Sequence, residues 1–376
     1  MKIIGLKEIK EAPGDWSEVF DYRIDLDELK EQVSKYQHFE KFIVIGNGGS
    51  ITSFESYYRA LWPKKEFFIL SSMEPRLIKE VREKFEKDKT LIIVISKSGF
   101  NLGPIEILLG FLDYPAILVI TNKHAGALRE IAEKRGYPII EHPEIGGRFS
   151  GATATAIVPA ILAGFNSEEI LSGIYAGYQR KDEAYTFATE LLNLETSGTE
   201  EIFLPIYNYY LMGSLNLIVQ LMHESVCKNG KGQTFYGAFS PEAQHHTNQR
   251  LFGGKRNMAA VFFTYQNQES SLIQVPDELK GIDFREAKLG MVDGIPYQQA
   301  LLAEYKGTKK DADNKGIPNY TIDFESINES EIGQLVGFWH LVAFYSSILR
   351  GVNPFDQPAV EDSKAITVEE IGKLKK

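Results

Sequence analysis

Two polar turns, each directly after an apolar run, have the residue types that bind a phosphate group. The sequence G-N-G-G-S occupies 46–50 after the run 42–45, and S-K-S-G occupies 96–99 after the run 91–95. A buried strand that opens through such a turn into a helix gathers backbone N–H groups, hydroxyls and a helix N-terminus around one point, which suits an anion. Lys97 adds a cation between two serines. Two such turns in one sheet indicate a phosphate site more strongly than either turn alone.

Two other interpretations of these turns are open. A dinucleotide-binding fold requires G-x-G-x-x-G after the first strand and an acid about 20 residues later. Gly46 and Gly48 fit that pattern, but Ile51 stands at the third glycine position, and the apolar run 66–70 ends in two serines without an acid. Alternatively, both are ordinary strand-to-helix turns, in which Gly and Ser are common. Lys97 favours the phosphate interpretation.

Polar residues of catalytic type occur in four further places, and each also has an ordinary structural explanation. Arg148 lies in G-G-R-F-S, where glycines let the backbone approach closely while the guanidinium points inward. Glu224 ends an apolar helical pattern, and Gln357 and Lys364 lie in the C-terminal tail. Two adjacent histidines lie in Q-H-H-T-N-Q at 244–249. Because adjacent side chains point apart and the usual ligand spacing is missing, we exclude a zinc site there.

Together with the phosphate turns, these residues suit proton transfer on a phosphorylated small molecule. A carboxylate can move a proton, an arginine can stabilise the negative charge that develops, and histidine and lysine can handle hydroxyl protons. The sequence has no Walker loop, no serine nucleophile elbow and no metal-binding motif. We therefore expect neither a metal nor an organic cofactor.

From about residue 41 to residue 364, the chain resembles the glucose-6-phosphate isomerases of the shorter prokaryotic type. G-G-R-F-S is similar to that family's most specific signature, and the two turns resemble its phosphate turns, usually G-I-G-G-S and S-K-T. E-S-V-C-K-N-G-K-G resembles the segment around the family's catalytic base, A-Q-H-H-T-N-Q resembles D-Q-H-S-Q, and N-P-F-D-Q-P-A-V-E-D-S-K resembles its C-terminal motif. The resemblance implies two sugar isomerase (SIS) domains, each a parallel sheet flanked by helices, and a homodimer with shared active sites.

The same resemblance implies the reaction and the role of each residue. The reaction would be the reversible conversion of glucose 6-phosphate to fructose 6-phosphate. His245, entering from the partner subunit and helped by Lys364, would open the sugar ring, and Glu224 would move the proton between C2 and C1. Arg148 would stabilise the cis-enediolate between these steps. The implied substrate-binding residues are Gly49, Ser50, Ser96, Lys97, Ser98, Asn101, Gly147 and Gln357.

Three positions depart from the family pattern. Cys227 stands where Gly is usual, three residues from the implied base. Ala243 replaces an acid beside the implied ring-opening histidine, and Asn101 stands where longer relatives often have Thr. None of the three removes an expected catalytic group.

Alternative functions follow from the same motifs. An isomerase that also accepts mannose 6-phosphate would differ only in its handling of the C2 epimer. A non-catalytic sugar-phosphate sensor would keep the phosphate turns but would not need Glu224, His245 and Lys364 together. An aminotransferase of the same fold would need a glutaminase domain with an N-terminal cysteine, which the sequence lacks.

Composition sets the class of protein. A chain of 376 residues is too long for one ordinary core, so we expect two domains. The net charge of −10 argues against a nucleic-acid or polybasic membrane surface. Cys227, the single cysteine, excludes internal disulfides. The early charges do not fit a signal peptide and no apolar run reaches the ~20 residues of a membrane span, so we expect a cytoplasmic protein.

The elements that must position these residues follow from the pattern of apolar runs. Alternating strands and helices predict an α/β fold with a parallel sheet covered on both faces. In the first half we expect strands near 41–46, 66–70, 90–95, 116–121 and 137–140, and helices at 50–62, 74–87, 102–112 and 124–135. In the second half we expect strands at 203–209, 259–265 and 319–324, and helices at 213–228 and 329–350, the last capped by Asn328 with Glu331 reaching back.

These elements divide the chain into five segments. We expect an N-terminal helical lead-in, a first SIS domain, a helical connector, a second SIS domain, and a tail that contributes to the active site. Their bounds are 1–40, 41–165, 166–199, 200–350 and 351–376.

Overall fold

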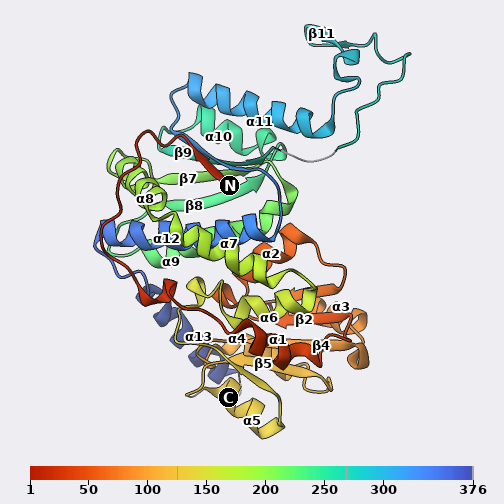
Figure 1. The fold of residues 1–376 in the computed structure, drawn as a ribbon, viewed down its shortest axis with the longest axis vertical. Coiled ribbons are helices and arrows are strands. Elements are labelled where there is room, and N and C mark those ends of the chain that lie inside the picture. The colour runs from red at the N-terminus through yellow and green to blue at the C-terminus, as the bar shows by residue number, and fades with distance from the viewer. Residues whose placement is uncertain (125, 267–269, 375–376) are drawn as a thin grey trace.

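The computed structural model describes residues 1–124, 126–266 and 270–374, and it consists of two α/β halves stacked along the long axis (Figure 1). Each half is built on a five-stranded sheet. The N-terminus lies in the half that contains β7, β8 and β9, whereas the C-terminal helix lies beside the other half (Figure 1). The predicted fold class, two doubly wound α/β units, is confirmed.

All five strands of the first sheet are parallel, in the order β3-β2-β4-β5-β6. They are β2 (Lys41–Ile45), β3 (Glu66–Leu70), β4 (Thr90–Ile95), β5 (Ile117–Thr121) and β6 (Ile139–Glu141). The helices of this half are α1 (Leu26–Ser34), α2 (Thr52–Leu61), α3 (Pro75–Lys84), α4 (Leu102–Leu109), α5 (Ala127–Arg135) and α6 (Ala154–Ala163). The strands lie within about two residues of the predicted ranges. They could be read from the sequence because they are apolar on both faces: Phe42 and Val44 pack in one hydrophobic cluster and Ile43 in another.

The strand order of this sheet reverses between β2 and β4. In open parallel sheets, ligands bind outside the carboxyl ends of the strands at such a switch point. The turn at 46–50 follows β2 and the turn at 96–99 follows β4. The topology therefore brings both predicted phosphate turns to the place where this fold binds ligands.

The second sheet has the order β1-β12-β9-β7-β8, in which β1 alone is antiparallel. Its strands are β1 (Lys2–Ile4), β7 (Glu201–Ile206), β8 (Thr234–Phe239), β9 (Met258–Tyr265) and β12 (Asn319–Phe324). The other helices are α7 (Ser167–Gln179), α8 (Lys181–Thr196), α9 (Ser214–Val226), α10 (Thr247–Gly253), α11 (Tyr297–Asn314), α12 (Glu329–Arg350) and α13 (Glu361–Lys373). A short hairpin of β10 (Asp283–Phe284) and β11 (Ala287–Lys288) projects from this half (Figure 1).

Two sequence predictions are corrected here. The lead-in 1–40 is not simply helical, because β1 adds a strand to the second sheet and only α1 is an α-helix in this segment. The segment 166–199, expected to be a helical connector, consists of the two helices α7 and α8, which are separated at Arg180. Asn328 does cap α12, accepting from the N–H of Glu331 at 2.9 Å, but the carboxylate of Glu331 pairs with the amino group of Met1 at 2.6 Å instead of reaching back.

Helix α12 is the central packing element between the two halves. By length and composition it could cross a membrane, but 83% of its apolar window is buried inside the protein, as in the core helix of a globular fold. It packs closely on α7, where a Cβ on Gly333 would lie 2.3 Å from the carbonyl oxygen of Ile170. The tail begins where α12 ends and lies beside the first half (Figure 1).

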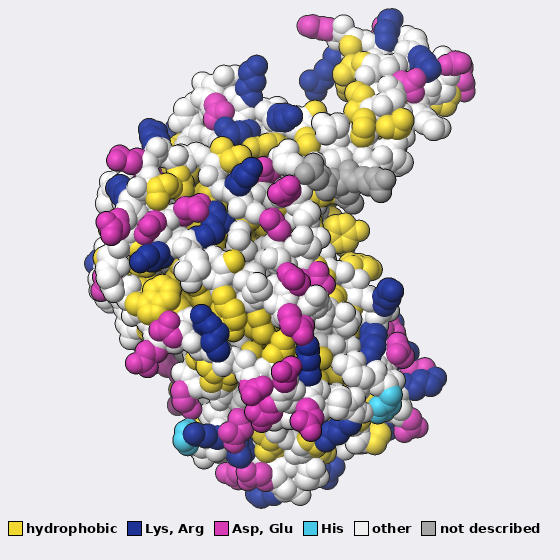
Figure 2. Space-filling view, in the orientation of Figure 1, with side chains coloured by type: hydrophobic (Ala, Val, Ile, Leu, Met, Phe, Trp, Pro, Cys, Tyr) yellow, Lys and Arg dark blue, Asp and Glu magenta, His cyan; other side chains and the backbone are white. Residues whose placement is uncertain are grey.

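On the face of the molecule seen in Figure 2, acidic and basic side chains are interspersed.

Candidate active site

Arg148 joins three distant segments of the chain at the site. It lies in the short 3-10 turn Gly147–Phe149 and is only 4% exposed. Its Nη1 donates to the carbonyl oxygens of Pro354 (3.0 Å) and Asp356 (3.1 Å), and its Nη2 donates to the side-chain oxygen of Gln357. Its Nε lies 3.0 Å from a carboxylate oxygen of Glu224 on α9. The inward-pointing arginine predicted from G-G-R-F-S is therefore present, and it is the group that holds the tail and the glutamate together.

The G-N-G-G-S turn, the first of the two predicted phosphate turns, lies directly against this arginine turn. A Cβ on Gly49 would lie 2.1 Å from the carbonyl carbon of Gly147, so no side chain fits at position 49. The hydroxyl of Ser150 donates to the carbonyl oxygen of Gly49 at 3.1 Å. Glycine at 49 is thus required by the close approach of two backbones. This contact explains why Gly49, Ser50 and Gly147 come together.

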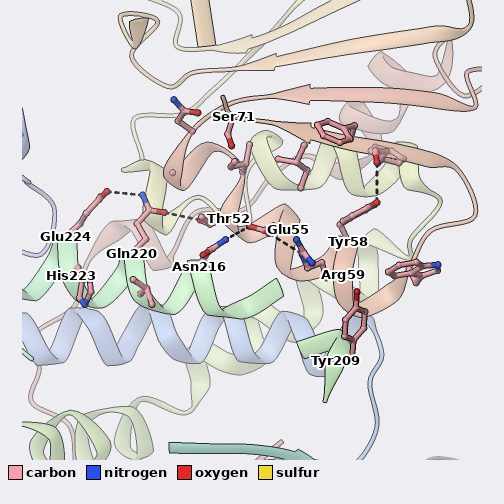
Figure 3. Close-up of a pocket in the computed structure, with 18 residues that line it drawn as sticks. Thr52, Glu55, Tyr58, Arg59, Ser71, Tyr209, Asn216, Gln220, His223 and Glu224 are labelled. Atoms are coloured by element: carbon pink, nitrogen blue, oxygen red, sulfur yellow. Dashed lines mark hydrogen bonds and ion pairs between the residues drawn. The ribbon is translucent and has the colours of Figure 1, made fainter. Parts of the chain in front are cut away.

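Glu224 lies near the end of α9 with both carboxylate oxygens oriented by neighbours. One oxygen faces Arg148, and the other accepts from the side-chain amide of Gln220 at 3.1 Å. The amide oxygen of Gln220 in turn accepts from the hydroxyl of Thr52 at 3.0 Å (Figure 3). The carboxylate is still one-third exposed. It is therefore fixed in position yet accessible to a small molecule.

Sequence reasoning missed Gln220 and Thr52. Gln220 lies four residues before Glu224 on the same face of α9, the spacing at which helical side chains meet. This spacing could have been used to predict that Gln220 contacts Glu224. The contribution of Thr52 from α2 depends on tertiary packing, which no local pattern contains.

A cleft of about 910 Å³ opens in front of Glu224. Gln220 and His223 lie at one end of it and Tyr58 and Tyr209 at the other (Figure 3). Asn47 and Gly48 also line it. It runs between α2 and α9. Its volume exceeds what a single sugar phosphate fills, so the far end is available to another group.

His223, which the sequence did not identify, is another titratable group that lines this cleft. The backbone N–H of Phe235 donates to its Nε2 at 2.8 Å, so Nε2 is an acceptor and Nδ1 carries the proton of the neutral ring. Burial lowers the pKa of His223, which also favours the neutral form. His223 is therefore a hydrogen-bonding group beside Glu224 and not a charged partner for it.

A second cavity, of about 730 Å³, lies between the S-K-S-G turn and α13. Four of the predicted site residues line it: Ser98, Asn101, Gln357 and Lys364. Gln357 also binds Arg148, so this cavity adjoins the Glu224 cleft through the arginine. The ammonium of Lys364 is paired with Glu361 at 2.7 Å and is mostly exposed.

The S-K-S-G turn itself has three different environments. Ser96 is buried, whereas Ser98 is exposed and accepts from the backbone N–H of Phe100 at 3.3 Å. The ammonium of Lys97 is one-third exposed and lies 3.8 Å from a carboxylate oxygen of Glu144. This distance is an ion pair without a hydrogen bond.

The structure does not bring His245 to the other predicted residues. His245 is exposed in the 3-10 turn Glu242–His245 after β8, and it lines neither of the two cavities. Its neighbour His246 pairs with Glu242 at 3.1 Å. Ala243, where an acid is usual, is fully buried, so a carboxylate at this position would face the core of the second half.

Lys228, the residue after Cys227, is a second basic residue that holds the tail. The ammonium of Lys228 pairs with Asp356 at 2.8 Å, and this contact lowers the pKa of Asp356. Helix α9 ends at Val226, so Cys227 begins the following loop as an exposed residue, and partial desolvation raises the pKa of its thiol. Among the described residues, no group of three or more His, Cys, Asp or Glu side chains could hold a metal ion.

The chain was compared with family models, with curated proteins and with solved structures. No family model matches the chain. It is 27% identical over 375 residues to the glucose-6-phosphate isomerase of Acholeplasma laidlawii, covering 93% of this chain and 87% of that protein. Its fold is similar to the crystal structure of a hypothetical protein from Thermus thermophilus (TM-score 0.84, 23% identity, 94% and 89% covered). It is also similar to the crystal structure of a glucose-6-phosphate isomerase from Chlamydia trachomatis (TM-score 0.76, 18% identity, 98% and 81% covered).

Proposed function

We infer that this chain is a member of the glucose-6-phosphate isomerase family, an aldose–ketose isomerase that interconverts glucose 6-phosphate and fructose 6-phosphate. The observation that carries this conclusion is the pairing of a buried Arg148 with an accessible Glu224 at 3.0 Å, in a fold that brings the two predicted phosphate turns to a topological switch point. A non-catalytic sensor would have no need to hold a carboxylate in this way.

We propose that Glu224 is the base of the reaction. Its carboxylate would take the proton from C2 of the open-chain aldose and return it to C1, through a cis-enediolate. Gln220 and Thr52 would orient the carboxylate so that one oxygen faces the substrate carbon. Arg148 would stabilise the negative charge on the enediolate oxygens, because its fixed guanidinium is desolvated and keeps its orientation during the reaction. The charge is met by side chains, so the proposal requires no metal.

The two turns and the tail would bind the phosphate and the rest of the sugar. Hydroxyls of Ser50, Ser96 and Ser98, the amide of Asn101 and the ammonium of Lys97 are suitable donors to a dianion. Gly49 and Gly147 would let the backbone approach the ligand, and Gln357 would link the phosphate cavity to the arginine. Ser98, Asn101 and Gln357 line one cavity, which supports this assignment.

We further propose a homodimer in which His245 of one subunit completes the site of the other. The exposure of His245 and its absence from the cavities of its own chain support this arrangement. With Lys364, His245 would move the protons that open the pyranose ring. The cleft has room beyond Glu224 for a loop of the partner.

Following the reaction in deuterated water tests the proposed function directly. The purified protein is incubated with fructose 6-phosphate in D₂O and the products are followed by proton NMR. An enediolate mechanism with a carboxylate base predicts glucose 6-phosphate that carries deuterium at C2, because the proton on Glu224 exchanges with solvent. Absence of any aldose product would contradict the proposed function. Product that stays free of deuterium after many turnovers would contradict proton transfer through a solvent-accessible carboxylate.

A further inference from the structure

Glu144 lies at the proposed phosphate site, although its negative charge opposes phosphate binding. One of its carboxylate oxygens is 3.8 Å from the ammonium of Lys97, and the other is 3.9 Å from Nε2 of His124. Lys97 follows β4, His124 follows β5 and Glu144 follows β6, so the three residues meet at the carboxyl edge of the first sheet. The carboxylate thus lies between two basic groups, one of which is the predicted phosphate clamp.

The segment that carries Glu144 is anchored on both sides while its side chain is exposed. His142 and Ile145 are buried, and the N–H of His142 donates to the carbonyl oxygen of Thr121 at 2.8 Å. The side chain of Glu144 itself is 62% exposed. It can therefore move from Lys97 toward His124 by side-chain rotation, without displacing the backbone that leads to Arg148.

We propose that Glu144 is a resident counter-ion of Lys97 that competes with the substrate phosphate, and that it shifts toward His124 when phosphate binds. An exposed ion pair at this distance is weak, so an incoming dianion can displace it. The pair nevertheless keeps a carboxylate beside the clamp, which weakens the binding of every anion there. This inference rests on the proposed phosphate site, and it assigns to Glu144 control over the affinity of that site.

Direct binding of inorganic phosphate tests this role without requiring turnover. Isothermal titration calorimetry is performed on the full chain and on E144Q, which keeps the size of the side chain and removes its charge. Removing the competing charge should lower the Kd for phosphate by roughly three- to tenfold. The matched control is E141Q, because Glu141 is also exposed, lies three residues earlier, and faces Arg129 at 3.7 Å and not Lys97. Its Kd should stay within about twofold of wild type.

The K97A background separates competition for Lys97 from a general effect of charge. K97A alone should weaken phosphate binding, and the gain from E144Q should be largely lost in K97A/E144Q. An unchanged or higher Kd in E144Q overturns the inference, as does an equal gain in E141Q or in the K97A background. If K97A leaves the phosphate affinity of the wild type unchanged, the phosphate site itself is overturned. That outcome is distinct from a failure of Glu144 alone.

Discussion

At the scale of single residues, the site depends on side chains whose partners are far apart in sequence. Arg148 binds Gln357, 209 residues later, and its Nε faces Glu224. The residue types at these positions could be predicted from the motifs. Their contacts could not, because the carbonyl groups of the tail that accept from Arg148 carry no signal in the sequence. For His245, the motif could be recognised in the sequence, but the sequence did not show that this residue lies outside the cleft of its own chain.

Arg148→Lys should be poorly tolerated although the charge is kept. The planar guanidinium contacts Glu224 with Nε while its other nitrogens bind the tail, and an ammonium cannot make these contacts together. We expect kcat to fall by roughly ten- to a hundredfold, in line with the loss of one or two charge-assisted hydrogen bonds. Steady-state kinetics on fructose 6-phosphate measures this. A change confined to KM would instead assign Arg148 to phosphate binding.

At the scale of elements, the first sheet was predictable and the second half less so. The strands of the first sheet are continuous apolar runs, because helices cover both faces. Strand β8, T-F-Y-G-A-F, was missed because it is an edge strand with a glycine and only partial burial. Strand β1 was missed because it is very short and pairs with β12, near the other end of the chain, so its structure comes from β12 and not from its own pattern.

Gly49→Ala tests whether the two glycine turns must touch. The added Cβ would lie 2.1 Å from the carbonyl carbon of Gly147, and only backbone movement can relieve that overlap. We expect a loss of roughly 1–3 kcal/mol in the free energy of unfolding, together with reduced turnover. The control is Gly307→Ala, because nothing lies within 4 Å of a Cβ there and the residue is inside α11. Denaturant unfolding of both variants gives the comparison; equal stabilities would show that the turns can separate freely.

At the scale of the whole molecule, burial of two histidines links stability to pH. Burial lowers the pKa of His142 to about 4 and that of His340 to about 3, from an ordinary value of 6.5. The unfolded chain therefore binds more protons than the folded chain between these values, so stability is complete above pH 6.5 and falls as the pH is lowered toward 4. Urea unfolding at about pH 7.5 and about pH 5 should show this decrease. A free energy of unfolding that does not change over this interval would contradict it.

The proposed sharing of active sites between two subunits makes a second prediction at this scale. E224Q and H245A should each be inactive alone. If His245 acts in the partner's site, a mixed dimer formed by co-refolding has one site with both lesions and one with neither, so activity returns. Differently tagged subunits identify the mixed dimers. If those dimers stay inactive, His245 acts within its own chain.

The central claim is that Glu224 moves the C2 proton, and E224Q tests it most directly. The amide keeps the size of the side chain and can still accept from Gln220, but it cannot take a proton. We predict that kcat falls by at least about 10²–10⁴-fold, the usual contribution of a general base, while the affinity for sugar phosphate, measured by calorimetry, stays within a few-fold of wild type. Turnover above about one-tenth of the wild-type value would contradict the account, because another group would then have to be the base.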